Sequence, residues 1–184
     1  SQMERLYLYQ LTNYNKILVQ RNNLLKQIRF QNNLIETLEA WDIQLVKYGS
    51  EVIKYREKFI KHLGEVCQKI HNKLTGGKEK ILLEYDRDVG YDSYLTELAK
   101  KRQKDLKYST TTVGPHRDDI SFIVNGIDIR KYGSQGQQRT AALSLKLAQI
   151  QLMREVMKES PILLLDDVLS ELDSNRKTYL LESI

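Results

Sequence analysis

The acid pair Asp166-Asp167, which directly follows the apolar run 162–165, is the first place where this sequence could do chemistry. A continuous apolar run is typical of a buried parallel strand, and open α/β sheets bind their ligands at the carboxyl ends of such strands. The pattern matches a Walker B element, whose aspartate holds the Mg²⁺ of a nucleoside triphosphate. A core strand that ends in a solvated turn would have the same pattern, so the acid pair alone leaves both interpretations open.

The residues that follow the acid pair favour the nucleotide interpretation. Residues 166–173 read Asp-Asp-Val-Leu-Ser-Glu-Leu-Asp and resemble the Walker B and D-loop octet of ABC-type ATPases, D-E-P-T-S-A-L-D, with identity at four positions. Asp167 stands in the place of the catalytic glutamate of that octet. The exchange keeps the carboxylate but shortens its reach.

A loop upstream of the acid pair could bind a phosphate. Residues 134–137 read Ser-Gln-Gly-Gln and match the ABC signature S-G-G-Q except at Gln135. A hydroxyl and free backbone N–H groups at the start of a helix favour a phosphate. A simple turn with Ser134 as the N-cap of a helix would use the same residues. The order of the two motifs, with 32 residues from Ser134 to Asp166, favours an ATPase.

Three motifs and the opening of the chain together resemble one family. Residues 112–119 (Thr-Val-Gly-Pro-His-Arg-Asp-Asp), 133–140 and 163–173 are similar to the carboxyl half of the bacterial RecF family, and residues 14–18 and 20–26 resemble the start of its helical arm. The resemblance covers nearly the whole chain. It implies part of a recombination and repair ATPase that is related to the SMC proteins.

The resemblance also implies substrates, partners and residue roles. It implies binding to DNA near single-strand/double-strand junctions, dimerisation around ATP and Mg²⁺, and action with RecR and RecO to help load RecA on gapped DNA. On this basis Asp166 would hold the metal through water, and Asp167 would polarise the attacking water as the catalytic residue. The other expected nucleotide contacts are Ser134, Gln135, Gly136, Gln137 and, through the D-loop, Asp173.

One motif of a complete ATPase does not occur in this sequence. The phosphate-binding loop G-x-x-x-x-G-K-[ST] is absent, since Gly76-Gly77-Lys78 has neither the spacing nor the final hydroxyl residue. We therefore expect a fragment without Walker A that by itself neither binds ATP tightly nor hydrolyses it. The alternative is a helical interaction module for RecR with no ATPase activity of its own. A metal-dependent nuclease is disfavoured because the sequence has no second acidic cluster at a recognisable spacing.

The positive charge of the chain is concentrated in its first half. Residues 1–80 carry 14 basic and 8 acidic side chains, a net charge of +6, whereas residues 81–184 carry 15 and 16, a net charge of −1. Lysine and arginine neutralise DNA phosphates without reading the sequence, but solvated helices are also rich in lysine. The candidate DNA contacts are Lys54, Arg56, Lys58, Lys61, Lys69 and Lys73.

Apolar spacing predicts the elements that position these residues. Steps of three and four predict helices over 7–28, over 34–48 with an end at Gly49, and over 52–74 with an end at Gly76-Gly77. The later pattern predicts a strand at 80–85, a helix capped by Asp92 or Ser93 that runs to 106, a hairpin around Asn125-Gly126 and a helix over 140–157.

These elements predict an α/β fold made of two parts. Residues 1–107 would form a helical arm, and residues 108–184 would form a partial ABC/SMC-like ATPase head with a hairpin, a signature helix and a Walker B strand. A content of 41% hydrophobic and 29% charged residues is typical of a globular chain, and no window resembles a membrane span.

Cysteine and histidine usage bears on location and metals. Cys67 is the single cysteine, so it forms no internal disulfide and favours a reducing, cytoplasmic setting. No metal-ligand spacing surrounds Cys67, which disfavours a zinc site. His116 is expected to be a structural hydrogen-bonding residue, whereas Arg117 could face a nucleotide or DNA, and the sequence leaves its role open.

Overall fold

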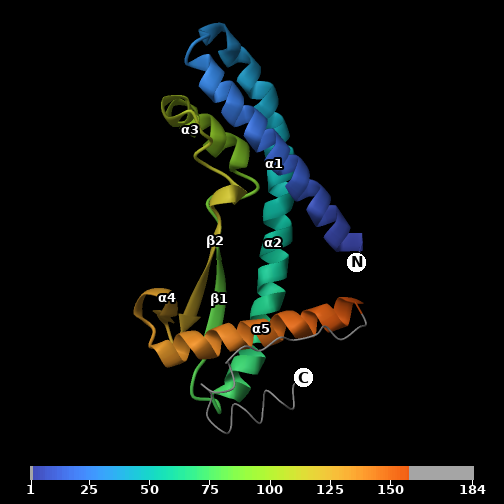
Figure 1. Cartoon of the computed structure of the whole chain (residues 1–184), viewed down its shortest axis with the longest axis vertical. Helices are drawn as coiled ribbons and strands as arrows, with labels where there is room; N and C mark the ends of the chain where they lie inside the picture. Colours follow the sequence, from blue (N-terminus) through green and yellow to red (C-terminus); the bar gives the residue numbers. More distant parts are fainter. Residues whose placement is uncertain (1, 158–184) are drawn as a thin grey trace. The chain divides into compact units, whose positions relative to one another are not determined.

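Two long helices open the chain. The computed structural model describes residues 2–157, with α1 at Gln2–Ile28, the 3-10 helix η1 at Asn32–Thr37 and α2 at Leu38–Leu74 (Figure 1). The predicted helix over 7–28 is therefore confirmed. Leu24, Leu25 and Ile28 at the end of α1 pack with Leu38 at the start of α2, which brings the two helices together around the turn that joins them.

The predicted helix end at Gly49 is wrong, because α2 continues through this residue without a break. A Cβ atom at position 49 would lie 2.6 Å from Cε1 of Tyr94 and 3.0 Å from Cε2 of Tyr14. Both tyrosines are almost completely buried. Gly49 is thus a close-packing position inside one 37-residue helix rather than the cap between two helices.

The third helix completes a core with the first two. α3 spans Tyr94–Tyr108, close to the predicted bounds, and the short helix η2 spans Pro115–Arg117. Ser93 precedes α3 as predicted, but its hydroxyl donates to the carbonyl oxygen of Gly90 rather than to a helix amide. A buried cluster draws on all three helices and includes Tyr14, Ile17, Leu45, Val52, Ile53, Tyr94 and Leu98.

A small sheet and two further helices follow. The strands are β1 at Ile81–Asp86, β2 at Asp119–Val124 and β3 at Ile127–Asp128, in the order β1-β2-β3. β2 and β3 are antiparallel, with Val124 opposite Ile127. The intervening Asn125 and Gly126 have φ values of 49° and 83°, as a type I′ turn requires. The predicted strand and hairpin are confirmed.

The last described elements are α4 at Ile129–Tyr132 and α5 at Gln135–Met157. α5 begins five residues before the start predicted at 140, inside the signature-like loop. Burial raises the pKa of the Cys67 thiol, on α2, to about 12, so this thiol is held in its unreactive protonated form. The predicted Walker B strand at 162–165 lies outside the described residues.

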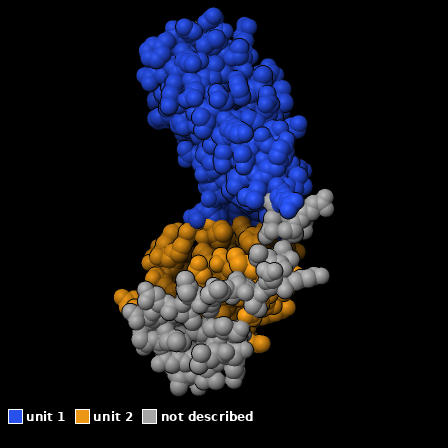
Figure 2. All heavy atoms as spheres, turned by 45° about the vertical axis from the view of Figure 1, so that its right-hand side comes forward, with its two compact units in different colours: residues 1–58, 85–119 blue, residues 59–84, 120–184 orange. Residues whose placement is uncertain are grey.

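The chain forms two compact units, each built from separate segments. Unit 1 comprises residues 1–58 and 85–119, and unit 2 comprises residues 59–84 and 120–184 (Figure 2). The division expected at 107/108 falls within unit 1, in the last turn of α3. Among the described residues, no helix is long and apolar enough to cross a membrane.

Candidate functional site

The signature-like loop forms a reciprocal cap at the start of α5. The backbone N–H of Gln137 donates to Ser134 Oγ over 3.2 Å, and the backbone N–H of Ser134 donates to Gln137 Oε1 over 3.1 Å. This pair of bonds is a capping box, which satisfies two amides that a helix start otherwise leaves without partners. Ser134 therefore caps a helix, as the simple-turn alternative for this loop predicted.

Among the described residues, the cap leaves hydrogen-bond donors on an exposed surface without acceptors. Ser134 Oγ accepts in the capping box, so its hydroxyl proton can still be donated. Within residues 2–157 the amide groups of Gln135 and Gly136 have no acceptor, as expected for the first turn of a helix. Because these residues are exposed, one hydroxyl and two amides are available at the positive end of the α5 dipole.

The residues before the loop fix its path. Asp128 Oδ1 accepts the amide of Arg130 and so caps α4, and Gln138 Nε2 donates to the carbonyl oxygen of Ile129 over 2.8 Å. Gly133 has no room for a side chain, because a Cβ atom there would lie 2.6 Å from the carbonyl oxygen of Ile129. Gly136 differs, since its nearest neighbour would be Ser134 Oγ at 3.9 Å. Glycine is thus required by the fold at 133, whereas at 136 it keeps open space.

The candidate site is described only in part. The predicted metal ligand Asp166, the predicted catalytic residue Asp167 and the D-loop residue Asp173 lie outside the described residues. Ser134, Gln135, Gly136 and Gln137 lie together as expected. In the portion of the chain that the structure describes, no cluster of histidine, cysteine and carboxylate side chains could hold a metal ion.

The predicted DNA contacts have different surroundings. Arg56 is committed to internal partners: its guanidinium donates to the Pro115 carbonyl oxygen over 2.5 Å, to Asp118 over 2.9 Å and to the Tyr7 hydroxyl. Lys54 forms an ion pair with Glu51 one helical turn away. The remaining predicted contacts are exposed and lie in unit 1 (Lys58) or in unit 2 (Lys61, Lys69 and Lys73).

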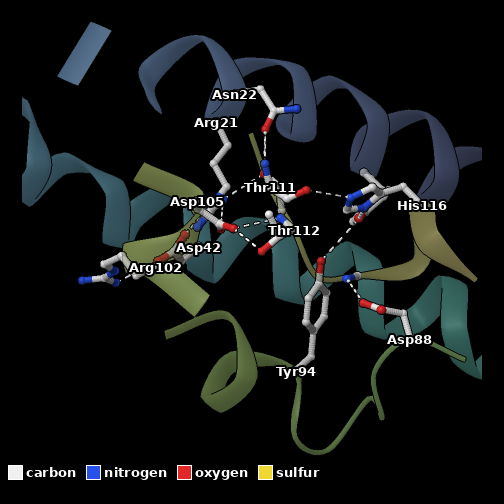
Figure 3. A network of polar contacts seen from close by, with 12 residues as sticks. Arg21, Asn22, Asp42, Asp88, Tyr94, Arg102, Asp105, Thr111, Thr112 and His116 are labelled. Atoms are coloured by element: carbon white, nitrogen blue, oxygen red, sulfur yellow. Dashed lines mark hydrogen bonds and ion pairs between the residues drawn. The ribbon is translucent and has the colours of Figure 1, made fainter. Parts of the chain in front are cut away.

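A buried polar network in unit 1 went unpredicted. Arg21 is completely buried, and its guanidinium donates to Asp42, to Asp105 over 2.7 Å and to Thr111 over 2.8 Å (Figure 3). Arg102 also donates to Asp42. This network joins α1, α2 and α3 to the segment that follows α3. Its signal in the sequence is an arginine on the otherwise apolar face of the first predicted helix.

His116 has the structural role expected of it. Nε2 lies 3.1 Å from the Thr111 carbonyl oxygen, which can only accept, so Nε2 carries the proton and Nδ1 accepts from the Tyr14 hydroxyl over 2.6 Å (Figure 3). Partial burial lowers the pKa of His116 below its ordinary value of 6.5, which favours the neutral ring. The neighbouring Arg117 is exposed, and its role stays open.

Curated relatives match the chain from end to end. It is 55% identical over 183 residues to the DNA replication and repair protein RecF of Agathobacter rectalis, and 44% identical over 193 residues to that of Acetivibrio thermocellus. In both cases the match covers 100% of this chain but only 51% and 52% of the relative. The chain therefore spans about half the length of the curated relatives that it matches. No protein-family model matches the chain.

Two solved structures have a similar fold over nearly the whole of this chain. One is described as the recombination mediator protein RecF-ATP in the RecFOR pathway, with a TM-score of 0.88 and 40% identity, and another as RecF-ATPrS in that pathway, with a TM-score of 0.86 and 39% identity. Each match covers 97% of this chain and 50% of the other. The predicted α/β class of a partial ATPase head with a helical arm is thus confirmed.

Proposed function

We propose, from the premise that this chain is a homologue of the RecF proteins along its whole length, that it supplies the helical arm and the signature-bearing part of the head of an ATP-dependent recombination mediator. In this proposal the complete protein dimerises around ATP, binds gapped or junction DNA and assists RecA loading with RecR and RecO. The observation that carries the proposal is the capped start of α5, which exposes a hydroxyl and two amides that have no acceptor within residues 2–157.

The geometry of the loop suits the terminal phosphate of ATP held by another subunit. Ser134 donates its hydroxyl proton, and the amides of Gln135 and Gly136 donate alongside it, so that three hydrogen bonds converge on one anionic group. Phosphoryl transfer depends mainly on positioning and charge stabilisation, which preorganised donors of this kind supply. The loop therefore contributes to a composite site that is complete only in a dimer.

The acidic residues take the complementary roles in this proposal. Asp166 holds Mg²⁺ through water, Asp167 polarises the attacking water, and Asp173 links the two heads through the D-loop. Magnesium neutralises charge on the phosphates when it is bound. Since the chain has no G-x-x-x-x-G-K-[ST] loop, the chain alone is not expected to turn over ATP.

The test extends the chain. An extended protein, in which an amino-terminal RecF segment with a phosphate-binding loop precedes residue 1, is examined by light scattering with and without Mg²⁺ and ATP. We expect dimers only with ATP, and Asp167→Asn should keep the dimer while it abolishes hydrolysis. An extended protein that stays monomeric with ATP, or magnesium-dependent hydrolysis by the unextended chain that Asp167→Asn removes, would contradict the proposal.

DNA binding in this proposal uses the exposed lysines. Lys61, Lys69 and Lys73 lie on the part of α2 that belongs to unit 2, and their solvent exposure suits contacts with backbone phosphates. Such contacts carry no sequence preference. Each one releases about one counterion from the DNA, so the binding affinity falls as the salt concentration rises. Affinity of the extended protein for gapped duplex DNA should therefore fall steeply with salt. Affinity that is independent of salt would remove the lysines from the proposal.

Exposed apolar side chains on α1 favour a second candidate function, a helical module that binds RecR without ATPase activity of its own. Leu6, Leu8, Tyr9 and Val19 have exposed fractions of 56–58%, so these apolar side chains are available to a protein partner. Co-sedimentation of the unextended chain with purified RecR distinguishes the two functions. Binding of the unextended chain to RecR, together with an extended protein that does not dimerise when ATP is added, would favour this candidate.

A further inference from the structure

A chain of polar contacts leads from the signature-like loop into the interior of unit 2. Gln137 Nε2 donates to Glu79 Oε1 over 3.2 Å, and Glu79 Oε2 lies 3.3 Å from His71 Nε2, close enough for an ion pair when the imidazole ring is protonated. His71 is on the last turn of α2, and Glu79 is in the loop between α2 and β1. The loop is thus tied to elements more than fifty residues away in the sequence.

The contacts return to the loop through α5. His71 Nδ1 lies 2.9 Å from Ser144 Oγ, and the Ser144 hydroxyl donates to the carbonyl oxygen of Thr140 over 2.7 Å. The Thr140 hydroxyl donates in turn to the carbonyl oxygen of Gly136 over 2.8 Å. We call the residues Gly136, Gln137, Glu79, His71, Ser144 and Thr140 the signature circuit, because its first two members belong to the signature-like loop.

Three of the six members of the signature circuit are out of contact with water. His71 and Ser144 are completely buried, and Thr140 is 1% exposed, whereas the side chain of Glu79 is 22% exposed. A buried polar group that loses its partner keeps the full cost of its desolvation. The hydrogen bonds of the circuit therefore favour a single arrangement of the loop, and the His71–Glu79 contact adds an ion pair when the ring is protonated.

The two ends of the Gln137 carboxamide have different partners. Its oxygen accepts from the backbone N–H of Ser134, and its nitrogen donates to Glu79. A rotated carboxamide would place its NH₂ group against an N–H donor and its oxygen against a carboxylate, and both contacts would be repulsive. Glu79 therefore selects the orientation of Gln137 that completes the capping box.

The backbone holds Glu79 at this position. The Thr75 hydroxyl donates to the carbonyl oxygen of His71 over 2.8 Å at the end of α2, and Gly76 and Gly77 turn the chain with φ values of 60° and 77°. After Glu79, the backbone of Lys80 exchanges hydrogen bonds with Asn125 of the hairpin. The carboxylate is thus attached to a fixed turn rather than to a free loop.

We propose that Glu79 is a positioning residue for the signature-like loop. By accepting from Gln137 it holds the capping box closed, and the closed box aims the Ser134 hydroxyl and the free amides of the first turn at the terminal phosphate of ATP. This inference rests on the proposed function only for the identity of the ligand. The positioning itself is a property of the described residues.

The first test needs no nucleotide. Hydrogen exchange of the Gln137 amide, which donates within the capping box, is measured in the chain with Glu79→Ala, with Glu79→Gln and with the control Glu84→Gln at an exposed position of β1. Loss of one hydrogen bond should raise exchange about fivefold in Glu79→Ala. Glu79→Gln keeps an acceptor oxygen and should restore protection, while Leu147 in the middle of α5 should be unaffected throughout.

Two outcomes of this test would overturn the inference. Unchanged exchange of the Gln137 amide in Glu79→Ala would mean that Glu79 does not hold the box. Faster exchange at Leu147 as well as at Gln137, without recovery in Glu79→Gln, would mean that Glu79 supports the unit in general rather than the loop.

The second test uses the extended protein. The ATP concentration for half-maximal dimerisation should rise about fivefold in Glu79→Ala and less than twofold in Glu79→Gln. An unchanged ATP requirement in Glu79→Ala would overturn the link to the phosphate. If the unmodified extended protein does not dimerise with ATP, the proposed function fails, and the exchange experiment still decides the role of Glu79.

Discussion

Arg21 lies near the carboxyl end of α1 and donates to two buried carboxylates, so its charge is compensated entirely inside unit 1. Arg21→Met removes the cation but leaves both acids in place. Asp42 keeps Arg102, and Asp105 keeps the amide and hydroxyl of Thr112, which reduces the penalty without removing it. We expect a loss of about 3 kcal/mol in the free energy of unfolding, measured by urea denaturation.

The control for this prediction is Arg29→Met, because Arg29 is exposed at the end of α1. Surface changes of this kind usually alter stability by about 0.5 kcal/mol or less. Equal stability of the Arg21 and Arg29 variants would show that the buried network contributes no more than an exposed charge does.

His116 predicts a pH dependence of stability. Since burial lowers the pKa of His116 below 6.5 in the folded chain, the unfolded chain binds more protons than the folded chain just below that pH. The free energy of unfolding should therefore fall as the pH drops through 6.5, until the folded ring is protonated as well. Urea denaturation between pH 8 and pH 5 should show a shallower slope for His116→Gln.

If His116→Gln and the unmodified chain lose stability in parallel as the pH falls, His116 does not titrate in the way that its hydrogen bonds and burial require.

At the scale of elements, two glycines of α2 provide a matched pair. A Cβ atom at Gly49 would collide with buried tyrosine rings, whereas at Gly64 it would lie 3.5 Å from Cβ of Leu83, an ordinary contact. Alanine is favoured over glycine inside a helix by about 1 kcal/mol. Gly64→Ala should therefore stabilise the chain by about 0.5–1 kcal/mol, and Gly49→Ala should destabilise it by about 1–2 kcal/mol.

Thermal unfolding of the two variants measures the difference. Opposite signs would support the assignment of Gly49 as a packing glycine. A stabilising effect of both substitutions would mean that the tyrosine rings move aside at little cost. Close packing would then not explain why glycine stands at position 49 of α2.

Gly49 also shows which elements can be predicted from local sequence patterns. Helices, the β1 strand and the hairpin around Asn125-Gly126 follow from apolar spacing and turn chemistry, and they were predicted. The continuity of α2 was not, because glycine after an apolar stripe also ends helices, and only the rings of Tyr14 and Tyr94 distinguish the two cases. Long-range packing carries this information, and it has no local signature.

The candidate site divides in the same way. The capping role of Ser134 could be predicted because the S-x-x-Q spacing is a local signature. Glu79 and His71 could not, since their relation to Gln137 depends on how α2, its following turn and α5 pack in unit 2. Arg21 lies between these cases: it interrupts an apolar stripe, but its acidic partners are 21 and 84 residues away.

At the scale of the whole molecule, a substitution of Gly136 should change ATP-dependent dimerisation without lowering the stability of the fold. Its position in α5 has no close neighbour, so Gly136→Ala should fold normally and gain up to about 0.5 kcal/mol from helix propensity. In the extended protein the added methyl group, 3.9 Å from Ser134 Oγ, occupies the space that the proposed phosphate needs. ATP-dependent dimerisation, measured by light scattering, should therefore fall at least tenfold in affinity while the unfolding midpoint stays the same or rises.

Gly133→Ala is the contrasting control, since its Cβ atom would meet the Ile129 carbonyl oxygen and should lower the unfolding midpoint. Normal assembly of the Gly136→Ala protein would place the phosphate elsewhere and remove the start of α5 from the interface between subunits.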